Sequence, residues 1–131
     1  MTRIFSACAK KKRAKAFVTL VLMLDNPCSL TFHDENLNAY LKQHEFLKKE
    51  IGMLIAIMNI PSSIHVYTHG GGIRSQITAI KAAIAKAARK SNGSVTKTLR
   101  KANYLKGDAR KKERKKYGLK KARRASQFSK R

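Results

Sequence analysis

The sequence predicts an α+β fold, in which helices pack on one sheet, followed by a basic C-terminal tail. The run of apolar and β-branched residues at 16–24 is typical of a well-buried strand. Residues 73–87 instead repeat apolar side chains at helical spacing, which predicts an amphipathic helix. Strands and helices that share the first hundred residues indicate a layered domain with a common apolar core.

The N-terminal part contains one strong strand signal. The strand at 16–24 is expected to end at Asp25-Asn26-Pro27, which are typical turn residues. The first sixteen residues of the chain are basic and carry no acidic side chain. They are expected to form an arm leading into the strand, with an organellar transit peptide as the alternative. Residues 29–32 favour a short return strand.

The middle of the chain is expected to alternate between helix and strand. A helix is predicted at 35–47, with Leu37, Tyr40 and Leu41 on one side and a cap from His33-Asp34. The apolar, Met-rich segment 51–60 fits a helix or a strand equally well. Residues 64–68 alternate in polarity and predict a strand.

A triple glycine at 70–72 precedes the strongest helix signal in the chain. Asn92-Gly93 is expected to end this helix in a left-handed cap. A further short helix is predicted at 94–102. Beyond Tyr104 the apolar periodicity fades, so residues 1–103 are assigned to a globular RNA-binding domain and residues 104–131 to an extended basic tail. The stripe of the long helix consists of Ile73, Ile77, Ile80, Ile84 and Ala87.

Positive charge is concentrated in the second half of the chain. Residues 69–131 hold 21 of the 30 Lys and Arg residues but only two of the seven acidic ones, Asp108 and Glu113. A segment with this charge repels itself and is usually neutralised by a polyanion. Because the basic segment lacks an apolar face that would insert into a bilayer, nucleic acid is favoured over a membrane as the partner.

No catalytic or metal-binding pattern stands out. The triple glycine is followed by Ile-Arg-Ser and lacks the Lys of a nucleotide-binding P-loop, so a tight strand-to-helix turn is favoured. The four histidines, of which those at 33 and 44 lie apart from the pair at 65 and 69, have no spacing typical of zinc. Asp108 and Glu113 are expected to pair with neighbouring arginines. No enzyme activity, cofactor or metal is therefore expected.

The two cysteines, Cys8 and Cys28, are too few for a disulfide framework. They fit a reducing compartment, where small apolar thiols are common.

Four segments, in this order, resemble the bacterial-type ribosomal protein S9 family of the small subunit. They are KKKRAKAFV at 10–18, GGGIRSQITAIKAAIAKA at 70–87, GDARKKERKKYG at 107–118 and ARRASQFSKR at 122–131. The glycine motif is weak by itself, whereas the ordered set is specific. The resemblance covers about residues 10–131, although the family usually has hydroxyl residues where Arg13 and Ala14 stand. Residues 20–65 diverge from the family, which favours an organellar version.

The resemblance implies a fold like the second domain of ribosomal protein S5, with a split βαβ core. It also implies a C-terminal tail threaded through the head of the small subunit, beside ribosomal RNA and neighbouring head proteins. In the family the final residues approach the anticodon stem of the P-site tRNA. Ser129, Lys130 and Arg131 are accordingly expected to contact tRNA.

The expected contacts to ribosomal RNA are cations that neutralise phosphates, glycines that allow close backbone approach, and a tyrosine able to stack. They are Lys10, Lys11, Lys12, Arg13, Gly71, Gly72, Arg74, Arg110, Lys111, Lys112, Arg114, Lys115, Lys116, Tyr117, Gly118, Lys120, Lys121, Arg123 and Arg124.

The leading hypothesis is a structural constituent of the small ribosomal subunit without catalytic chemistry. The alternative is a free, histone-like protein that compacts nucleic acid, although the QFSKR ending argues against it because generic compaction needs no fixed terminus. An enzyme built on the glycine loop is a distant third. A mitochondrial ribosome is favoured, with a plastid next.

Overall fold

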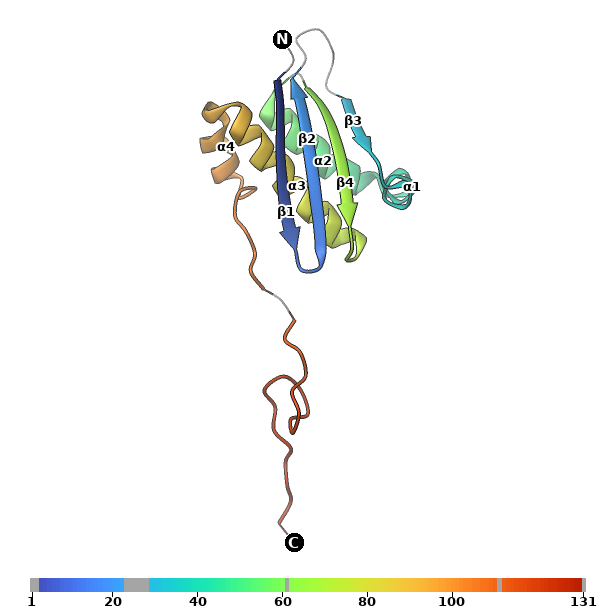
Figure 1. Ribbon diagram of the computed structural model, residues 1–131, viewed down its shortest axis with the longest axis vertical. Helices are drawn as coiled ribbons and strands as arrows, with labels where there is room; N and C mark the ends of the chain where they lie inside the picture. The colour runs from blue at the N-terminus through green and yellow to red at the C-terminus, as the bar shows by residue number, and fades with distance from the viewer. Residues whose placement is uncertain (1–2, 23–28, 61, 111, 131) are drawn as a thin grey trace.

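In a computed structural model the chain forms a mixed four-stranded sheet with helices packed on one face (Figure 1). The structure describes residues 3–22, 29–60, 62–110 and 112–130. The elements are β1 (Arg3–Lys11), β2 (Ala14–Leu22), β3 (Ser29–Phe32), α1 (Glu35–Gln43), α2 (Glu45–Met58), β4 (Ser62–His69), α3 (Ile73–Ser91), a 3₁₀ turn (Gly93–Val95) and α4 (Thr96–Lys101). The predicted α+β class is confirmed.

The strands lie in the order β1-β2-β4-β3. β1 and β2 form an antiparallel hairpin, β2 pairs antiparallel with β4, and β3 pairs parallel with β4. The short strand expected at 29–32 is confirmed, but it lies at the sheet edge beside β4. The strand expected at 64–68 is also confirmed, within the longer β4.

The prediction of an N-terminal arm was wrong, because residues 3–11 form β1. This strand pairs with β2 over its whole length, from Arg3 opposite Leu22 to Lys11 opposite Ala14. Its inward positions include the small residues Ala7 and Ala9, whose intrinsic preference for strands is low. Pairing with β2 overrides that preference, and the composition of residues 3–11 alone does not reveal this pairing.

The strand expected at 16–24 begins two residues earlier, as β2. Its last two expected residues, the turn at 25–27 and Cys28 lie outside the described residues.

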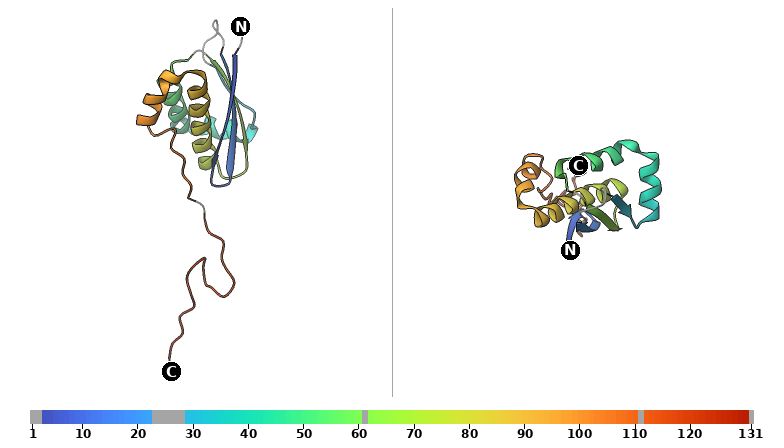
Figure 2. Two further views of the ribbon diagram at one scale, coloured as in Figure 1. Left: turned by 60° about the vertical axis from the view of Figure 1, so that its left-hand side comes forward. Right: turned by 90° about the horizontal axis from the view of Figure 1, so that it is seen from above.

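The inner face of the sheet and the stripe of α3 make the core. α2, α3 and α4 lie on this side of the sheet, and α1 lies at its β3 edge (Figure 2). Burial of these apolar side chains is the main favourable contribution to folding, at about 1.5–3 kcal/mol for each large side chain. The nearly fully buried residues include Val18, Leu20, Leu37, Ile51, Leu54, Ile64, Val66, Ile77, Ile80, Ile84 and Leu99.

The middle of the chain holds two helices where the sequence predicts one helix and an ambiguous segment. The helix expected at 35–47 is divided at His44 into α1 and the beginning of α2. Of the expected cap residues His33-Asp34, Asp34 caps α1, since its Oδ1 accepts a hydrogen bond from the Leu37 amide at 3.3 Å. The ambiguous segment is helical because Ile51, Leu54 and Met58 share one side of α2 and pack into the core.

The expected left-handed cap at the end of α3 was wrong. α3 extends to Ser91, and Asn92 has an extended backbone with φ −141°. The Asn92 side chain instead accepts a hydrogen bond from the Ser94 amide at 3.1 Å. The chain therefore turns directly into the 3₁₀ turn and α4, which together confirm the short helix predicted at 94–102.

After α4 the chain leaves the globular part as an extended segment (Figure 1). Residues 106–110 and 112–130, here called the C-terminal segment, form neither helix nor strand and are mostly exposed. Within the described parts of the chain, the helices are too short or too polar to cross a bilayer.

Candidate nucleic-acid interface

A basic hollow lies between the β1–β2 turn and the beginning of α3. It has a volume of about 510 Å³ and is lined by Lys12, Arg13, Gly71, Gly72, Ser75 and Lys112. Three of its six lining residues are cationic, and none carries a carboxylate. Because its lining provides no counter-charge for these cations, the basic hollow can accept an anion from a binding partner.

Glycine conformation brings α3 close to the hairpin. Gly70 and Gly71 have φ values of +70° and +73°, in the left-handed region that favours glycine. A Cβ added to Gly71 would lie 2.8 Å from both the amide nitrogen and the Cβ of Ala14. The hairpin and the glycine turn approach each other this closely only because Gly71 has no side chain.

The helix terminus adds a positive field to the basic hollow. Gly72 is the N-cap of α3 and provides no capping side chain, and the first turn contains no acidic residue. The Gln76 side chain donates a hydrogen bond to the Gly70 carbonyl at 3.3 Å, which ties the glycine turn to the helix. Backbone amides at a helix N-terminus favour anions, so the hollow suits a phosphate group.

The structure brings together five of the residues expected to contact ribosomal RNA. They are Lys12, Arg13, Gly71, Gly72 and Lys112. Ser75 was missed by the sequence interpretation, although its position three residues after the N-cap places its hydroxyl in the first turn of the helix.

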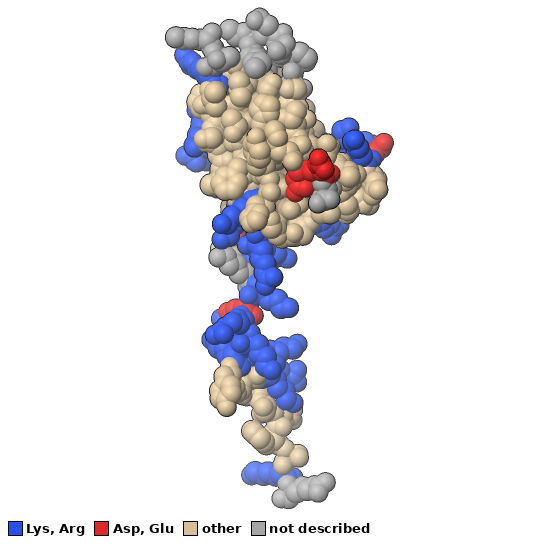
Figure 3. All heavy atoms as spheres, turned by 45° about the vertical axis from the view of Figure 1, so that its right-hand side comes forward, with Lys and Arg blue, Asp and Glu red and all other residues tan. Residues whose placement is uncertain are grey.

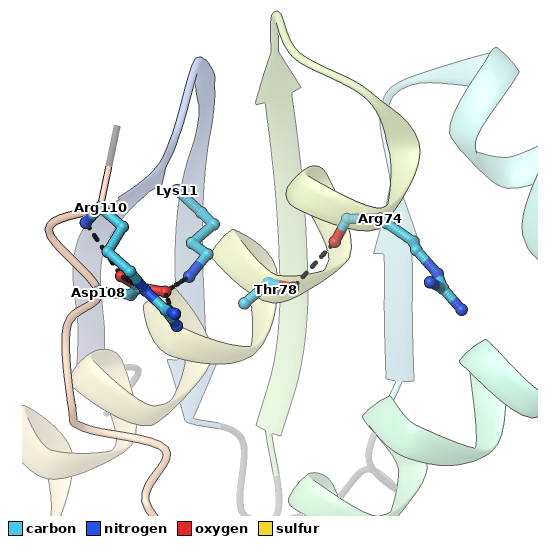
Figure 4. A network of polar contacts seen from close by, with 5 residues as sticks. All are labelled: Lys11, Arg74, Thr78, Asp108 and Arg110. Atoms are coloured by element: carbon cyan, nitrogen blue, oxygen red, sulfur yellow. Dashed lines mark hydrogen bonds and ion pairs between the residues drawn. The ribbon is translucent and has the colours of Figure 1, made fainter. Parts of the chain in front are cut away.

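Arg74 and Lys10 do not line the hollow. Arg74 is exposed and points away from the hairpin end (Figure 4). Lys10 is exposed on the outer face of β1.

A salt-bridge cluster beside the hollow fastens the C-terminal segment to the hairpin (Figure 4). The Lys11 Nζ donates a hydrogen bond to Asp108 Oδ2. Arg110 donates from Nε and from a terminal guanidinium nitrogen to the two oxygens of Asp108, both at 3.1 Å. The Arg110 backbone amide also donates to Asp108 Oδ1, at 3.0 Å.

These contacts stabilise the ionised form of the Asp108 carboxylate. Hydrogen bonds from Arg110, and then from Lys11, hold the pKa of Asp108 well below its usual range. The same pairing with Asp108 raises the pKa of Arg110. Lys11 and Arg110, both expected to contact RNA, therefore already have a carboxylate partner.

The C-terminal segment contains a loop closed by a second ion pair. Arg123 donates from Nε and from a terminal nitrogen to the two Glu113 oxygens, at 2.9 Å and 2.6 Å. Gly118 lies in this loop with φ +76°, a value that favours glycine. The expected pairing with neighbouring arginines is confirmed for Asp108, whereas Glu113 pairs with an arginine ten residues further along the chain.

Cations dominate the surface of the C-terminal segment (Figure 3). The rings of Tyr117 and Phe128 are almost wholly exposed, so neither packs on the body of the protein. Lys111 and Arg131 lie outside the described residues. The remaining cations that the sequence assigns to RNA on this segment are exposed: Lys112, Arg114, Lys115, Lys116, Lys120, Lys121, Arg123 and Arg124.

The histidines are arranged differently from the sequence interpretation. His33 lies beside β4 rather than apart from it, with its ring stacked on Tyr67 at a centroid distance of 4.0 Å. The His33 and His65 rings are 5.8 Å apart. Among the described residues, no three His, Cys, Asp or Glu side chains are grouped so as to hold a metal ion.

Comparison with known proteins gives one family. The family model described as "Ribosomal protein S9/S16" matches residues 9–131. Proteins named "Small ribosomal subunit protein uS9" are similar over 91% of this chain: 39% identical in Phytoplasma australiense, covering 92% of that protein, 36% in Synechococcus sp. (strain JA-3-3Ab), covering 88%, and 40% in Mesomycoplasma hyopneumoniae (strain 7448), covering 91%. The chain therefore belongs to the ribosomal protein S9/S16 family, which comprises structural ribosomal proteins and not enzymes.

Proposed function

We propose that this protein is a structural constituent of the small ribosomal subunit and that it binds ribosomal RNA in the subunit head. The observation that carries the proposal is the basic hollow, where three cations and a helix N-terminus converge without a carboxylate. Such a site neutralises a phosphate without reading base sequence. The family and the names of its relatives support the ribosomal assignment.

The fold and domain division fit this role. We assign the globular part to a fold like the second domain of ribosomal protein S5, and we divide the chain into a globular domain at 1–103 and a tail at 104–131. The exposed, cation-rich C-terminal segment supports this division. In our proposal the tail occupies an RNA-lined channel, because its charge needs a polyanion to neutralise it.

The end of the tail is proposed to contact the P-site tRNA. Ser129 and Lys130 are exposed at the far end of the C-terminal segment, and Arg131 follows them. The cations would hold anticodon-stem phosphates electrostatically, and the hydroxyl would donate to a phosphate or ribose oxygen.

The relatives named above are all bacterial, including a cyanobacterium, and they give no support to the mitochondrial assignment that the sequence favours. The assignment to an organellar ribosome therefore rests on the divergence of residues 20–65 alone. A plastid and a bacterial ribosome are the competing assignments.

Sedimentation tests the proposed function directly. The tagged chain, expressed in its own cells, is run through a high-salt sucrose gradient, with organelle and cytosol fractions analysed separately. Co-migration with the small subunit supports the ribosomal role and gives the compartment. Migration with DNA, or release to the top of the gradient, would instead favour the histone-like alternative.

A further inference from the structure

The sheet has an outer face that the helices leave open. α2, α3 and α4 all lie on the inner side of the sheet, which is behind the strands in Figure 1, and Figure 2 shows the same arrangement from two other directions. Side chains alternate across a strand, so every second residue of each strand points to this outer face. The two central strands place Phe17 on β2 directly opposite Tyr67 on β4.

We propose that this outer face is a stacking platform for unpaired bases of RNA, and this inference rests on the proposed role in binding ribosomal RNA. The platform is defined by Phe17, Tyr67 and His33 in its centre and by Lys10 and Lys15 at its hairpin end.

The aromatic rings of the platform are exposed and adjacent. Phe17 is 51% exposed and Tyr67 49% exposed, although both belong to the central strands of the sheet. The exposed His33 ring stacks face to face on Tyr67, with centroids 4.0 Å apart and an interplanar angle of 2°, so it covers one face of Tyr67 and extends the stack by its own ring. Exposed rings on a sheet can stack on any base, because every base has a π face.

Charge on the outer face favours RNA over a protein partner. Lys10 lies directly opposite Lys15, and Lys15 lies opposite His69 on its other side. The four strands contain no Asp or Glu residue. Like charges opposite each other destabilise a sheet unless a counter-charge reaches them, and phosphates would supply it.

The position of the platform connects it to the basic hollow. Lys12 and Arg13 of the hollow form the turn of the hairpin whose strands carry Lys10 and Lys15. Phe17 follows Lys15 by two residues, which is about 7 Å along a strand. A phosphate in the hollow and unpaired bases on the platform can thus belong to one RNA segment.

The binding test uses the full-length protein and two labelled probes at one salt concentration: a twelve-nucleotide polyuridine strand and an RNA duplex of the same length. The variant combines Phe17→Leu and Tyr67→Leu, which removes the rings and keeps apolar side chains. We expect affinity for the single strand to fall about tenfold or more, because a base–aromatic stack contributes strongly, while affinity for the duplex stays within about twofold.

Matched variants control for fold and for general binding. Phe46→Leu removes a ring that is 70% exposed on α2, away from the platform, and should leave both affinities unchanged. Phe17→Tyr keeps the ring and should retain binding of the single strand. An unchanged affinity of the double variant for the single strand, or an equal loss for both probes, would overturn the platform.

Cross-linking in assembled subunits separates this inference from the proposed function. Cys8 lies on the outer face opposite Phe17 and is exposed, so a photoreactive group attached there samples the platform in a Cys28→Ser background. Cross-links to ribosomal RNA support the platform. Cross-links only to another protein overturn it in favour of a protein partner, and failure to assemble at all refutes the proposed function itself.

Discussion

The Nζ of Lys11 donates a hydrogen bond to Asp108, a residue 97 positions further along the chain. This contact joins the end of β1 to the C-terminal segment. Four residues further along that segment, Lys112 lines the basic hollow. Because Arg110 binds the same carboxylate, Asp108 fixes the point at which the C-terminal segment leaves the body.

Asp108→Asn should release the C-terminal segment from the hairpin. The amide cannot accept the two charge-assisted hydrogen bonds from Arg110 as well as the one from Lys11. Amide hydrogen exchange at residues 106–110 should therefore become faster, with exchange in the core strands unchanged. If exchange at these residues stays at the wild-type rate, Asp108 does not hold the segment.

The effect of Asp108 should depend on pH in a defined window. A carboxyl group whose pKa is lowered in the folded state contributes stability that is fully present above its unfolded pKa of about 3.9. That contribution is lost as the pH falls through the lowered pKa of the folded state. The difference in amide exchange at residues 106–110 between wild type and Asp108→Asn should thus be constant from pH 7 to about pH 5 and should shrink in more acidic solution. Carboxyl ¹³C NMR follows the protonation of Asp108 in the same pH range.

Gly71 and Gly72 offer a matched test of the glycine turn. Gly71→Ala places a Cβ 2.8 Å from Ala14 at a φ of +73°. It should lower the free energy of unfolding by about 2–4 kcal/mol, because a left-handed backbone and overpacking each contribute. Gly72→Ala meets no atom within 4 Å, at a φ of −92°. It should change the free energy of unfolding in urea by less than about 1 kcal/mol; equal effects at both positions would contradict this account.

The basic hollow should contribute to the salt dependence of RNA binding. Replacing Lys12, Arg13 and Lys112 together by Ala removes the three cations that line it. Because the hollow is proposed to hold one phosphate, the slope of log affinity against log salt should become less steep by about 0.7–0.9, the contribution of one phosphate contact. Replacing Lys42, Lys48 and Lys49, which lie on α1 and α2 away from the hollow, provides a control of equal charge. An identical change of slope in both triple variants would show that only net charge matters.

A partly buried ion pair and an exposed ion pair should contribute differently to the free energy of unfolding. Lys81 on α3 donates to Glu50 on α2 at 2.5 Å, and both side chains are only partly exposed. Glu50→Gln should lower the free energy of unfolding by about 1 kcal/mol. Glu113→Gln breaks the exposed pair with Arg123 and should have no measurable effect on global unfolding. Urea denaturation of the two variants checks both values.

Removal of Lys130 and Arg131 should weaken the retention of P-site tRNA without affecting folding. Lys130 is exposed at the end of the C-terminal segment, far along the chain from the core, and Arg131 follows it in the sequence. The measurement is the rate of tRNA dissociation from small subunits that carry the truncated chain, together with reading-frame maintenance. Ser126→Ala serves as a control that preserves charge. An unchanged dissociation rate would refute the tRNA contact.

Local patterns predicted several elements correctly. The apolar stripe of α3 and the alternation in β4 repeat within a few residues, so each pattern can be recognised from the neighbouring residues alone. Asp34 as a cap is an equally local feature. The basic, ordered motifs in the second half of the chain likewise indicate the family, because they are short stretches of contiguous sequence.

The wrong predictions concern features that depend on distant partners. β1 carries alanines on its inner side, and it is a strand because β2 supplies the complementary ladder. Asn92 was expected to belong to a left-handed cap, but the 3₁₀ turn begins directly after it and leads into α4, so its backbone is extended. His33 was placed apart from β4, whereas the parallel pairing of β3 with β4 brings it onto Tyr67.

The sequence by itself determined the α+β class, the main helices and strands, the cationic C-terminal half and the family. These follow from periodicity, charge and motifs, all of which are properties of neighbouring residues. Only the tertiary structure decided that Lys12, Arg13, Gly71 and Lys112 line one hollow and that Phe17 faces Tyr67. The physical reason is that strand order and the close glycine turn set these distances, and both depend on packing between segments far apart in the chain.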